Sequence, residues 1–335
     1  MTLNTLQAFT EAEFDTARKL LAAKVSTMLG RKMEEADWDF VYCHAKMIPG
    51  TDWSNLHIDV NYQGLGVEHK MLRITRSGSI LQECGTTKMH PAGTRSIRIP
   101  NEPNADLAAA NILAQYSDLI DKRAHAVRES NDGKASDMRI GWLLWKDGLD
   151  EFLYFEVEML KPRIADYYAE WSVTPARGAR KESRSLWIYE KETGKKKFSV
   201  TTDAGVKIQP YFDVPPPSDK NLYHFKVQGV LLDGGLVEVW LTKSTAKYLE
   251  LLYGALDAKT LSNAILDFNP EVSDEGAKEF FIGEDIAIPV QISVEAYKKL
   301  WQIFRANSDE DLLQQFALNS GATPKQGIAP HPSTI

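Results

Sequence analysis

The sequence contains few features of a secreted or membrane-bound protein. Its 335 residues include two cysteines, Cys43 and Cys84, too few for a disulfide framework and suited to a reducing compartment. No run approaches the roughly 18 consecutive apolar residues that a membrane span needs. Residues 1–4 lack the basic region and apolar stretch of a secretory signal. We therefore expect a cytoplasmic protein without a membrane partner.

An excess of positive charge is also lacking. The chain has 39 basic and 46 acidic side chains, a formal net charge of -7, so any nucleic-acid binding must depend on local basic patches. Hydrophobic residues make up 43% and charged residues 25%, which is typical of globular proteins and excludes a disordered chain. The length allows one large domain or two smaller ones.

Residues 1–170 show the pattern of an α/β protein with a mixed β-sheet. Thr10 and Glu13 form a capping box that predicts a helix start, and Asn104 predicts the start of a helix ending near Arg128. Alternating or apolar runs predict strands at 39–43, 56–62, 67–74, 138–145 and 152–160. The second and third form a hairpin across Gly64 and Gly66. The order is helix, three strands, helix and two strands, which favours a right-handed βαβ unit.

The composition changes after residue 170. Residues 177–197 hold eight basic and three acidic side chains, a local balance of +5, and residues 215–217 are three prolines. A second hairpin is predicted at 222–232 and 236–241, with helices near 244–253, 293–306 and 308–318. We interpret 171–320 as a C-terminal α+β region for target recognition or dimerisation, and 321–335 as a disordered tail.

The first hairpin carries the most informative side chains. Because side chains alternate along a strand, Glu68 and Lys70 share one face, while Val67 and His69 take the other. Asp59 on the preceding strand can then meet Glu68 and Lys70. Two carboxylates form an oxygen site suited to Mg²⁺, and a lysine beside them can orient or deprotonate a water.

This arrangement resembles the PD-(D/E)xK nuclease superfamily, which includes most Type II restriction endonucleases. The resemblance implies that Asp59 and Glu68 bind Mg²⁺ and that Lys70 assists the attacking water. It also implies an αβββαβ restriction-endonuclease-like core within 1–170, and a cytoplasmic homodimer that hydrolyses double-stranded DNA to 5′-phosphate and 3′-hydroxyl ends. Ile58 stands where the family often has proline. A helical glutamate sometimes joins the family's metal site, and Glu34 or Glu35 is the candidate here.

Other acidic residues offer alternatives, because a bare acid-x-Lys pattern arises by chance about twice in a chain of this composition. Asp52 competes with Asp59 as the first carboxylate. Asp137, Glu156 and Glu158 form a rival centre, in which Glu replaces the lysine or a different hydrolase uses the Glu156/Glu158 pair. The histidines and cysteines lack the spacing of a zinc site.

Basic residues outside the hairpin are candidates for DNA contact. Arg95 and Arg98 follow the hairpin, and the basic segment contributes Arg177, Arg180, Lys181 and Arg184. The alternative function is therefore a non-catalytic DNA-binding protein that uses segment 177–197.

Overall fold

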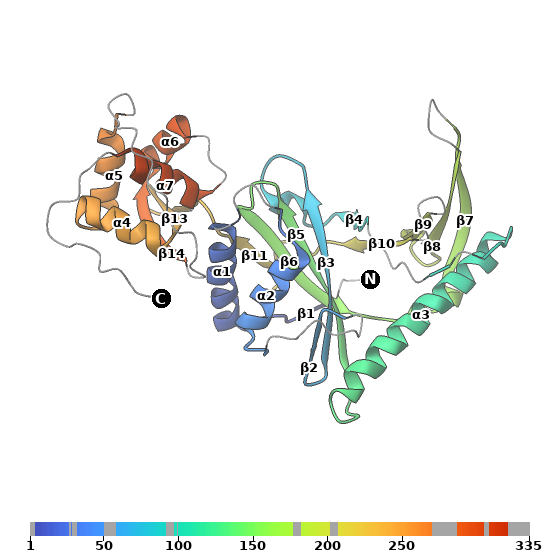
Figure 1. Cartoon of the computed structure of the whole chain (residues 1–335). Helices are drawn as coiled ribbons and strands as arrows, with labels where there is room; N and C mark the ends of the chain where they lie inside the picture. Colours follow the sequence, from blue (N-terminus) through green and yellow to red (C-terminus); the bar gives the residue numbers. More distant parts are fainter. Residues whose placement is uncertain are drawn as a thin grey trace, which may run out of the picture.

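A mixed sheet with helices on both faces lies at the centre of the molecule (Figure 1). The computed structural model describes residues 4–26, 28, 32–49, 58–91, 97–98, 100–176, 182–201, 207–269, 287–304 and 308–320. The central strands follow the order β1-β6-β5-β3-β2, with β11 also beside β6. Their bounds are β1 Thr5–Leu6, β2 Val60–Tyr62, β3 Leu65–Ile74, β5 Asp137–Lys146, β6 Glu151–Glu158 and β11 Tyr223–Lys226.

The strand pairing supports the predicted mixed sheet. Helix α3 (Ala105–Glu129) connects β3 to β5, and these two strands pair in parallel, while the other central pairs are antiparallel. The Asn104 side chain accepts hydrogen bonds from the N–H groups of Asp106 and Leu107, so the predicted helix start is confirmed. The protein is thus a mixed α/β protein.

Helices α1 (Glu11–Ser26) and α2 (Glu35–Ala45) cover one face of the central sheet, and α3 covers the other. The capping box at the start of α1 is present, since the Thr10 N–H donates to Glu13 Oε2 (2.7 Å) and the Glu13 N–H to Thr10 Oγ1 (3.3 Å). These reciprocal bonds satisfy two backbone donors that the first helical turn leaves unpaired.

The strand predicted at 39–43 is wrong, because these residues lie within α2. The five-residue apolar run is too short to separate a period of 2 from a period of 3.6. The buried residues of α2 include Trp38, Val41, Tyr42 and Ala45, which form the i, i+3, i+4, i+7 stripe of a helix, and Asp37 and Cys43 beside it are also buried. The described residues between α1 and α3 therefore contribute two strands, β2 and β3, to the central sheet, where three strands were expected.

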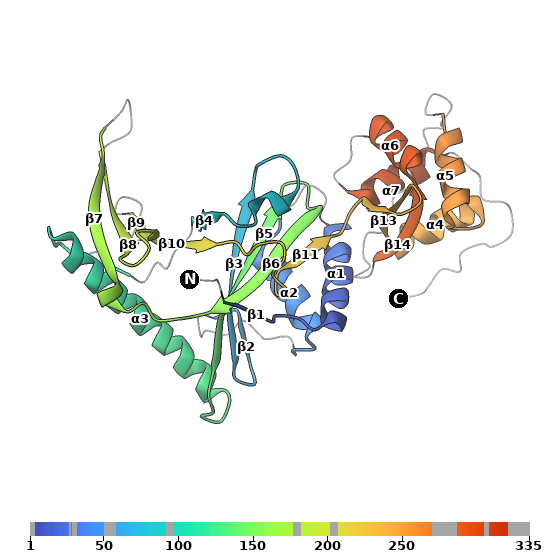
Figure 2. The same ribbon diagram turned by 180° about the vertical axis from the view of Figure 1, so that it is seen from behind.

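A second sheet extends from the central one. Its order is β4-β10-β9-β8-β7. The bounds are β4 Thr87–Met89, β7 Tyr167–Thr174, β8 Ser183–Glu190, β9 Lys196–Thr201 and β10 Lys207–Asp213. Leu186 and Ile188 of β8 pack against Ile112 and Leu113 of α3, so this helix supports both sheets, as Figure 2 shows.

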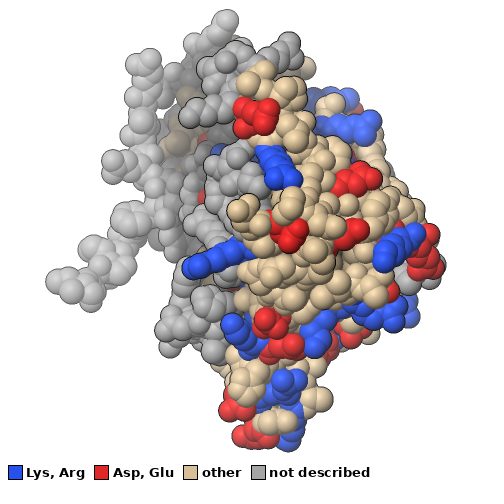
Figure 3. All heavy atoms as spheres, turned by 90° about the vertical axis from the view of Figure 1, so that its right-hand side faces the viewer, with Lys and Arg blue, Asp and Glu red and all other residues tan. Residues whose placement is uncertain are grey.

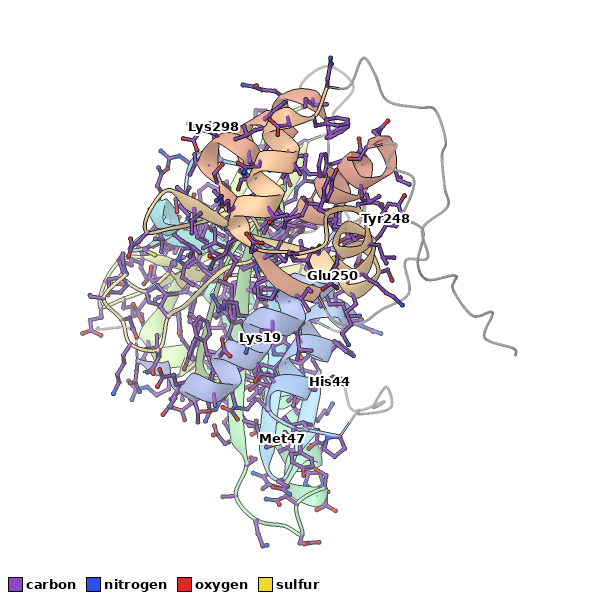
Figure 4. All side chains as sticks on the ribbon, turned by 90° about the vertical axis from the view of Figure 1, so that its left-hand side faces the viewer. Lys19, His44, Met47, Tyr248, Glu250 and Lys298 are labelled. Carbon is purple, nitrogen blue, oxygen red and sulfur yellow. The ribbon has the colours of Figure 1, made fainter. Side chains whose placement is uncertain are left out.

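The C-terminal elements form a third sheet with its own core (Figure 4). Strands β12 (Val230–Leu232), β13 (Leu236–Thr242) and β14 (Ala287–Ser293) pair antiparallel in that order. The predicted helices are confirmed as α4 (Lys243–Tyr253), α6 (Val294–Ile303) and α7 (Asp309–Asn319), while α5 (Ala258–Asp267) and β14 were not predicted. In Figure 4 this unit carries the labelled Tyr248, Glu250 and Lys298 and lies beside α1, which carries Lys19. Across the described ranges, no helix has the length and apolar character that a bilayer crossing requires.

Candidate active site

The β2–β3 hairpin carries the central side chains of the candidate site and sets the direction in which they point. Gly64 in its turn has a φ of +85°, and a Cβ there would lie 2.4 Å from Asn131 Nδ2, so the turn requires glycine. Val60 pairs with Val67, and both are fully buried on the α1/α2 side. Glu68 and Lys70 consequently face the α3 side, as their alternation predicted.

Two cations hold the Glu68 carboxylate, which is 7% exposed. Its Oε1 atom accepts hydrogen bonds from Lys70 Nζ (2.5 Å) and from an Nη atom of Arg123 (3.0 Å). Arg123 lies on α3, 55 residues along the chain, so sequence spacing did not indicate it. The pairing compensates the burial of a charged group.

Asp59 lies just before β2 and faces the same group of charges. Its Oδ2 accepts a hydrogen bond from the His69 backbone N–H at 2.6 Å, which fixes the carboxylate beside β3. Burial, together with the neighbouring Glu68 and Glu35 carboxylates, raises the pKa of Asp59 to about 7, while His69 and Lys70 act in the opposite direction. The structure thus brings Asp59 next to Glu68 and Lys70.

Glu35, in the first turn of α2, also approaches these carboxylates. Burial raises its pKa, Lys70 acts in the opposite direction, and Asp39 and Glu68 add to the increase. Glu34, the other predicted glutamate, is the N-cap residue of α2, and its backbone N–H donates to Asp37 Oδ2 at 3.1 Å. Both glutamates line the same cleft as Glu68. Glu35 is therefore the better placed of the two to join the carboxylates.

A contact between buried His69 and partly exposed Asp39 joins α2 to the hairpin. His69, which is 0% exposed, contacts Asp39 Oδ1 of α2 through Nδ1 at 2.5 Å. The same residue donates its backbone N–H to Asp59. One position on β3 therefore fixes both the Asp59 carboxylate and the helix that carries Glu35. This contact spans 30 residues, and nothing in the sequence pattern indicated it.

Glu34, Glu35 and Glu68 line a cleft of about 920 Å³, and Asp59 lies beside Glu68 but is not among the residues that line the cleft. Its walls come from β3, β5 and α3 and, across the cleft, from Phe198, Ile208 and Pro210 of the second sheet. Four cationic side chains line it, namely Lys70, Arg73, Lys122 and Arg123. An acidic pair among cations in an open cleft suits a charged substrate that a divalent cation bridges to the protein.

The donor set fits Mg²⁺ better than a cation that needs an all-protein site. Within the described part of the chain, no three His, Cys, Asp or Glu side chains lie close enough to hold a metal ion. Mg²⁺ is commonly bound through one or two carboxylates, with waters and substrate phosphate completing the shell. Among the described residues, Asp59 Oδ1 and Glu68 Oε2 accept no hydrogen bond, so each carboxylate retains an oxygen for a cation.

We expect affinity for Mg²⁺ to increase with pH up to about 7. The pKa of Asp59 is raised to about 7, so the carboxyl group is protonated below that pH and must lose its proton before it can bind a cation. Calorimetric titration should show affinity falling by up to about tenfold per pH unit from pH 7 to pH 5.5. A higher Mg²⁺ concentration should lower the pH at which half of the sites hold the cation. Affinity that is unchanged over this range would contradict Asp59 as a ligand.

The rival centre is arranged as an internal ion-pair network. Arg139 of β5 binds Asp137 through Nε (2.9 Å) and Glu156 through an Nη atom (2.9 Å), and the Tyr154 hydroxyl donates to Glu156 Oε1 (2.8 Å). Glu156 is 0% exposed, while Glu158 and Asp137 are exposed at the sheet end. Both Glu156 oxygens are thus occupied by protein donors, which gives this carboxylate a structural role.

The predicted DNA-contact residues are only partly within the described residues. Four of them, Arg95, Arg177, Arg180 and Lys181, lie outside the described residues, and so does Asp52, the alternative first carboxylate. Arg98 is exposed, and Gln115 of α3 binds its backbone N–H and carbonyl groups (2.9 and 2.8 Å).

Arg184 of β8 is also exposed, and its guanidinium lies 3.7 Å from the centroid of the Trp171 ring. Figure 3 shows that basic and acidic side chains are interspersed on the side of the molecule that contains β7 and part of α3. Any attraction for DNA there must come from particular side chains, because the charges on this face are mixed.

Comparisons with protein-family models, with curated proteins and with solved structures found no match.

Proposed function

We propose that the protein is a Mg²⁺-dependent endonuclease that hydrolyses double-stranded DNA, with a restriction-endonuclease-like core. The observation that carries the proposal is the meeting of Asp59 with Glu68 and Lys70, two residues that line a cleft with further cationic side chains. The resemblance of this set to the PD-(D/E)xK pattern supports the same assignment. Glu35 is proposed as a further acidic residue of the site, because it lies close enough for the charge of Glu68 to raise its pKa and that of Lys70 to lower it.

The chain's own residues have distinct parts in this reaction. Asp59 and Glu68 would hold Mg²⁺, which when bound would neutralise charge on the scissile phosphate and the leaving oxygen. Lys70, whose Nζ atom lies 2.5 Å from Glu68 Oε1, can orient the attacking water and hold it near the phosphate. Arg123 keeps Glu68 in position from α3, and Arg73 and Lys122 can contact neighbouring phosphates from the cleft wall.

A homodimer follows from the proposed substrate. A duplex target with two-fold symmetry presents two equivalent strands, and a C2 pair of subunits would cut both of them. In this proposal residues 1–170, with β11 added to their sheet, form the nuclease core in a cytoplasmic protein, and the rest of 171–320 serves target recognition or dimerisation. Residues 321–335, expected to form a tail, lie outside the described residues.

One observation favours the alternative of a non-catalytic DNA-binding protein. Lys70 and Arg123 both bind Glu68, so the charge of this carboxylate is compensated without a metal ion. Such ion pairs also occur on strand faces that have no catalytic role. The basic segment 177–197 would then provide the phosphate contacts.

Plasmid cleavage separates the two functions. We expect supercoiled plasmid or phage DNA, tested with and without base modification, to be nicked and linearised with Mg²⁺ and to stay intact with EDTA. End labelling should find 5′-phosphates. Salt-dependent duplex binding without nicking under Mg²⁺ or Mn²⁺ would support the non-catalytic function and contradict the nuclease proposal.

A further inference from the structure

A cluster of aromatic rings surrounds one lysine on the second sheet, on the face that points away from α3. We name this the aromatic face, and it consists of Tyr168 of β7, Trp187 and Tyr189 of β8, Lys196 of β9 and Tyr211 of β10. Lys196 Nζ lies 3.3 Å from the centroid of the Trp187 ring, 5.7 Å from that of Tyr189 and 5.8 Å from that of Tyr211. Tyr168 stacks on Tyr189 with centroids 5.1 Å apart.

A β-bulge creates this arrangement. The register between β8 and β9 shifts between Ile188 and Tyr189, so Ile188 pairs with Phe198 while Tyr189 pairs with Lys196. Phe198 remains on the α3 side with the core of the sheet. Without the shift, Lys196 would share the face of Phe198, because alternate residues of a strand point the same way.

The aromatic face is not a hydrophobic core. Leu186, Ile188 and Val200 on the opposite face are 0% exposed beneath α3, whereas each of the four rings is only partly buried. Partial burial lowers the pKa of Lys196, and the exposed Glu170 acts in the opposite direction. Aromatic faces replace part of the water around this ammonium group, and an anion placed against it would restore the lost solvation.

The chemistry of the face favours unpaired nucleotides. Rings offer stacking surfaces for bases, and the central amine offers a contact for a phosphate. A duplex keeps the faces of its bases stacked internally, and a neutral sugar gives no partner to the amine. Neighbouring lysines are already paired, Lys195 with Asp213 (3.4 Å) and Lys197 with Glu190 (3.8 Å), so stacking must provide much of the affinity.

We propose that the aromatic face binds single-stranded DNA, with bases stacked on Trp187 and its neighbouring tyrosines and a phosphate on Lys196. The choice of DNA rests on the proposed function, and the local balance of +5 over residues 177–197 favours an anionic chain. The cleft wall and this face belong to the same strands, since β9 and β10 supply Phe198 and Ile208 to the cleft. Phe198 and Ile208 point to the α3 side, so an unpaired strand on the aromatic face would lie on the opposite side of the second sheet from the cleft.

The test measures anisotropy of a fluorescein-labelled 15-nucleotide oligothymidylate with the full-length protein in EDTA. Trp187→Ala is expected to weaken binding by about 5- to 150-fold, the effect of losing one stacked base, while Trp187→Phe stays close to wild type. Lys196→Ala should reduce the slope of log affinity against log salt concentration by about one. Trp301→Ala is the matched control, since Trp301 is 45% exposed on α6. Melting temperatures identify any variant that fails to fold.

Several outcomes would overturn the inference. These are wild-type protein that binds no oligothymidylate, a folded Trp187→Ala variant with unchanged affinity, and quenching of Trp187 fluorescence by a neutral oligosaccharide instead of the oligonucleotide. The proposed nuclease function fails separately. If plasmid stays intact while Trp187-dependent binding persists, only the nuclease proposal fails, and if plasmid is cut while Trp187→Ala binds normally, only this inference fails.

Discussion

Replacing Glu68 by glutamine is expected to reduce Mg²⁺-dependent DNA cleavage by about a thousandfold or more. The amide cannot act as an anionic ligand, and it weakens the contacts with Lys70 and Arg123. Lys70→Ala should lower the rate by about 10²- to 10⁴-fold, the range associated with a positioned group that orients a water or moves its proton. Initial rates of plasmid nicking at saturating Mg²⁺ measure both effects.

The matched control is Glu158→Gln, which changes an exposed glutamate of the rival centre. It should cut at the wild-type rate. Thermal unfolding of each variant shows whether lost activity reflects lost structure, which matters because Glu68 is buried. Folded Glu68→Gln and Lys70→Ala proteins that cut as fast as wild type would refute the site assignment.

The second large effect is expected on stability. Arg139→Ala removes the cation that binds Glu156 and leaves a fully buried carboxylate that, within the described part of the chain, keeps its hydrogen bond from the Tyr154 hydroxyl. Breaking a buried ion pair from one side typically costs about 3–5 kcal/mol. We expect the free energy of unfolding in urea to fall by about this amount.

Two further variants interpret this result. Arg163→Ala breaks an exposed pair with Asp166 and should change stability little. The double variant Arg139→Met with Glu156→Met should recover much of the loss, because it removes both charges together. If Arg139→Ala and Glu156→Gln instead abolish cleavage while the unfolding free energy is unchanged, the rival centre is the catalytic one.

Local patterns predicted the local features of the fold. Thr10 with Glu13 and Asn104 each marked a helix start correctly, because a capping side chain acts within three residues. The alternation around Glu68 and Lys70 predicted their shared face, because the period of a strand is fixed. Helices expected near 244–253, 293–306 and 308–318 are present as α4, α6 and α7.

Features that depend on distant contacts escaped prediction. The run at 39–43 is helical because Trp38, Val41 and Tyr42 pack on the central sheet, which a five-residue pattern cannot indicate. β11 pairs with β6 across about 70 residues, and β4 joins the second sheet through β10.

Dependence on distant contacts also explains why two contacts of the candidate site were not predicted. The contact of Arg123 with Glu68 and that of Asp39 with His69 join elements whose approach is set by the packing of α3 and α2. Side chains brought together in this way leave no spacing pattern in the sequence.

Anomalous diffraction from crystals soaked in Mn²⁺ tests the central assignment most directly. We predict a peak within coordination distance of Asp59 and Glu68, and its loss in crystals of Asp59→Asn. A peak held by Asp137 or Glu158, or a fully soaked crystal without any peak at Asp59 and Glu68, would contradict it.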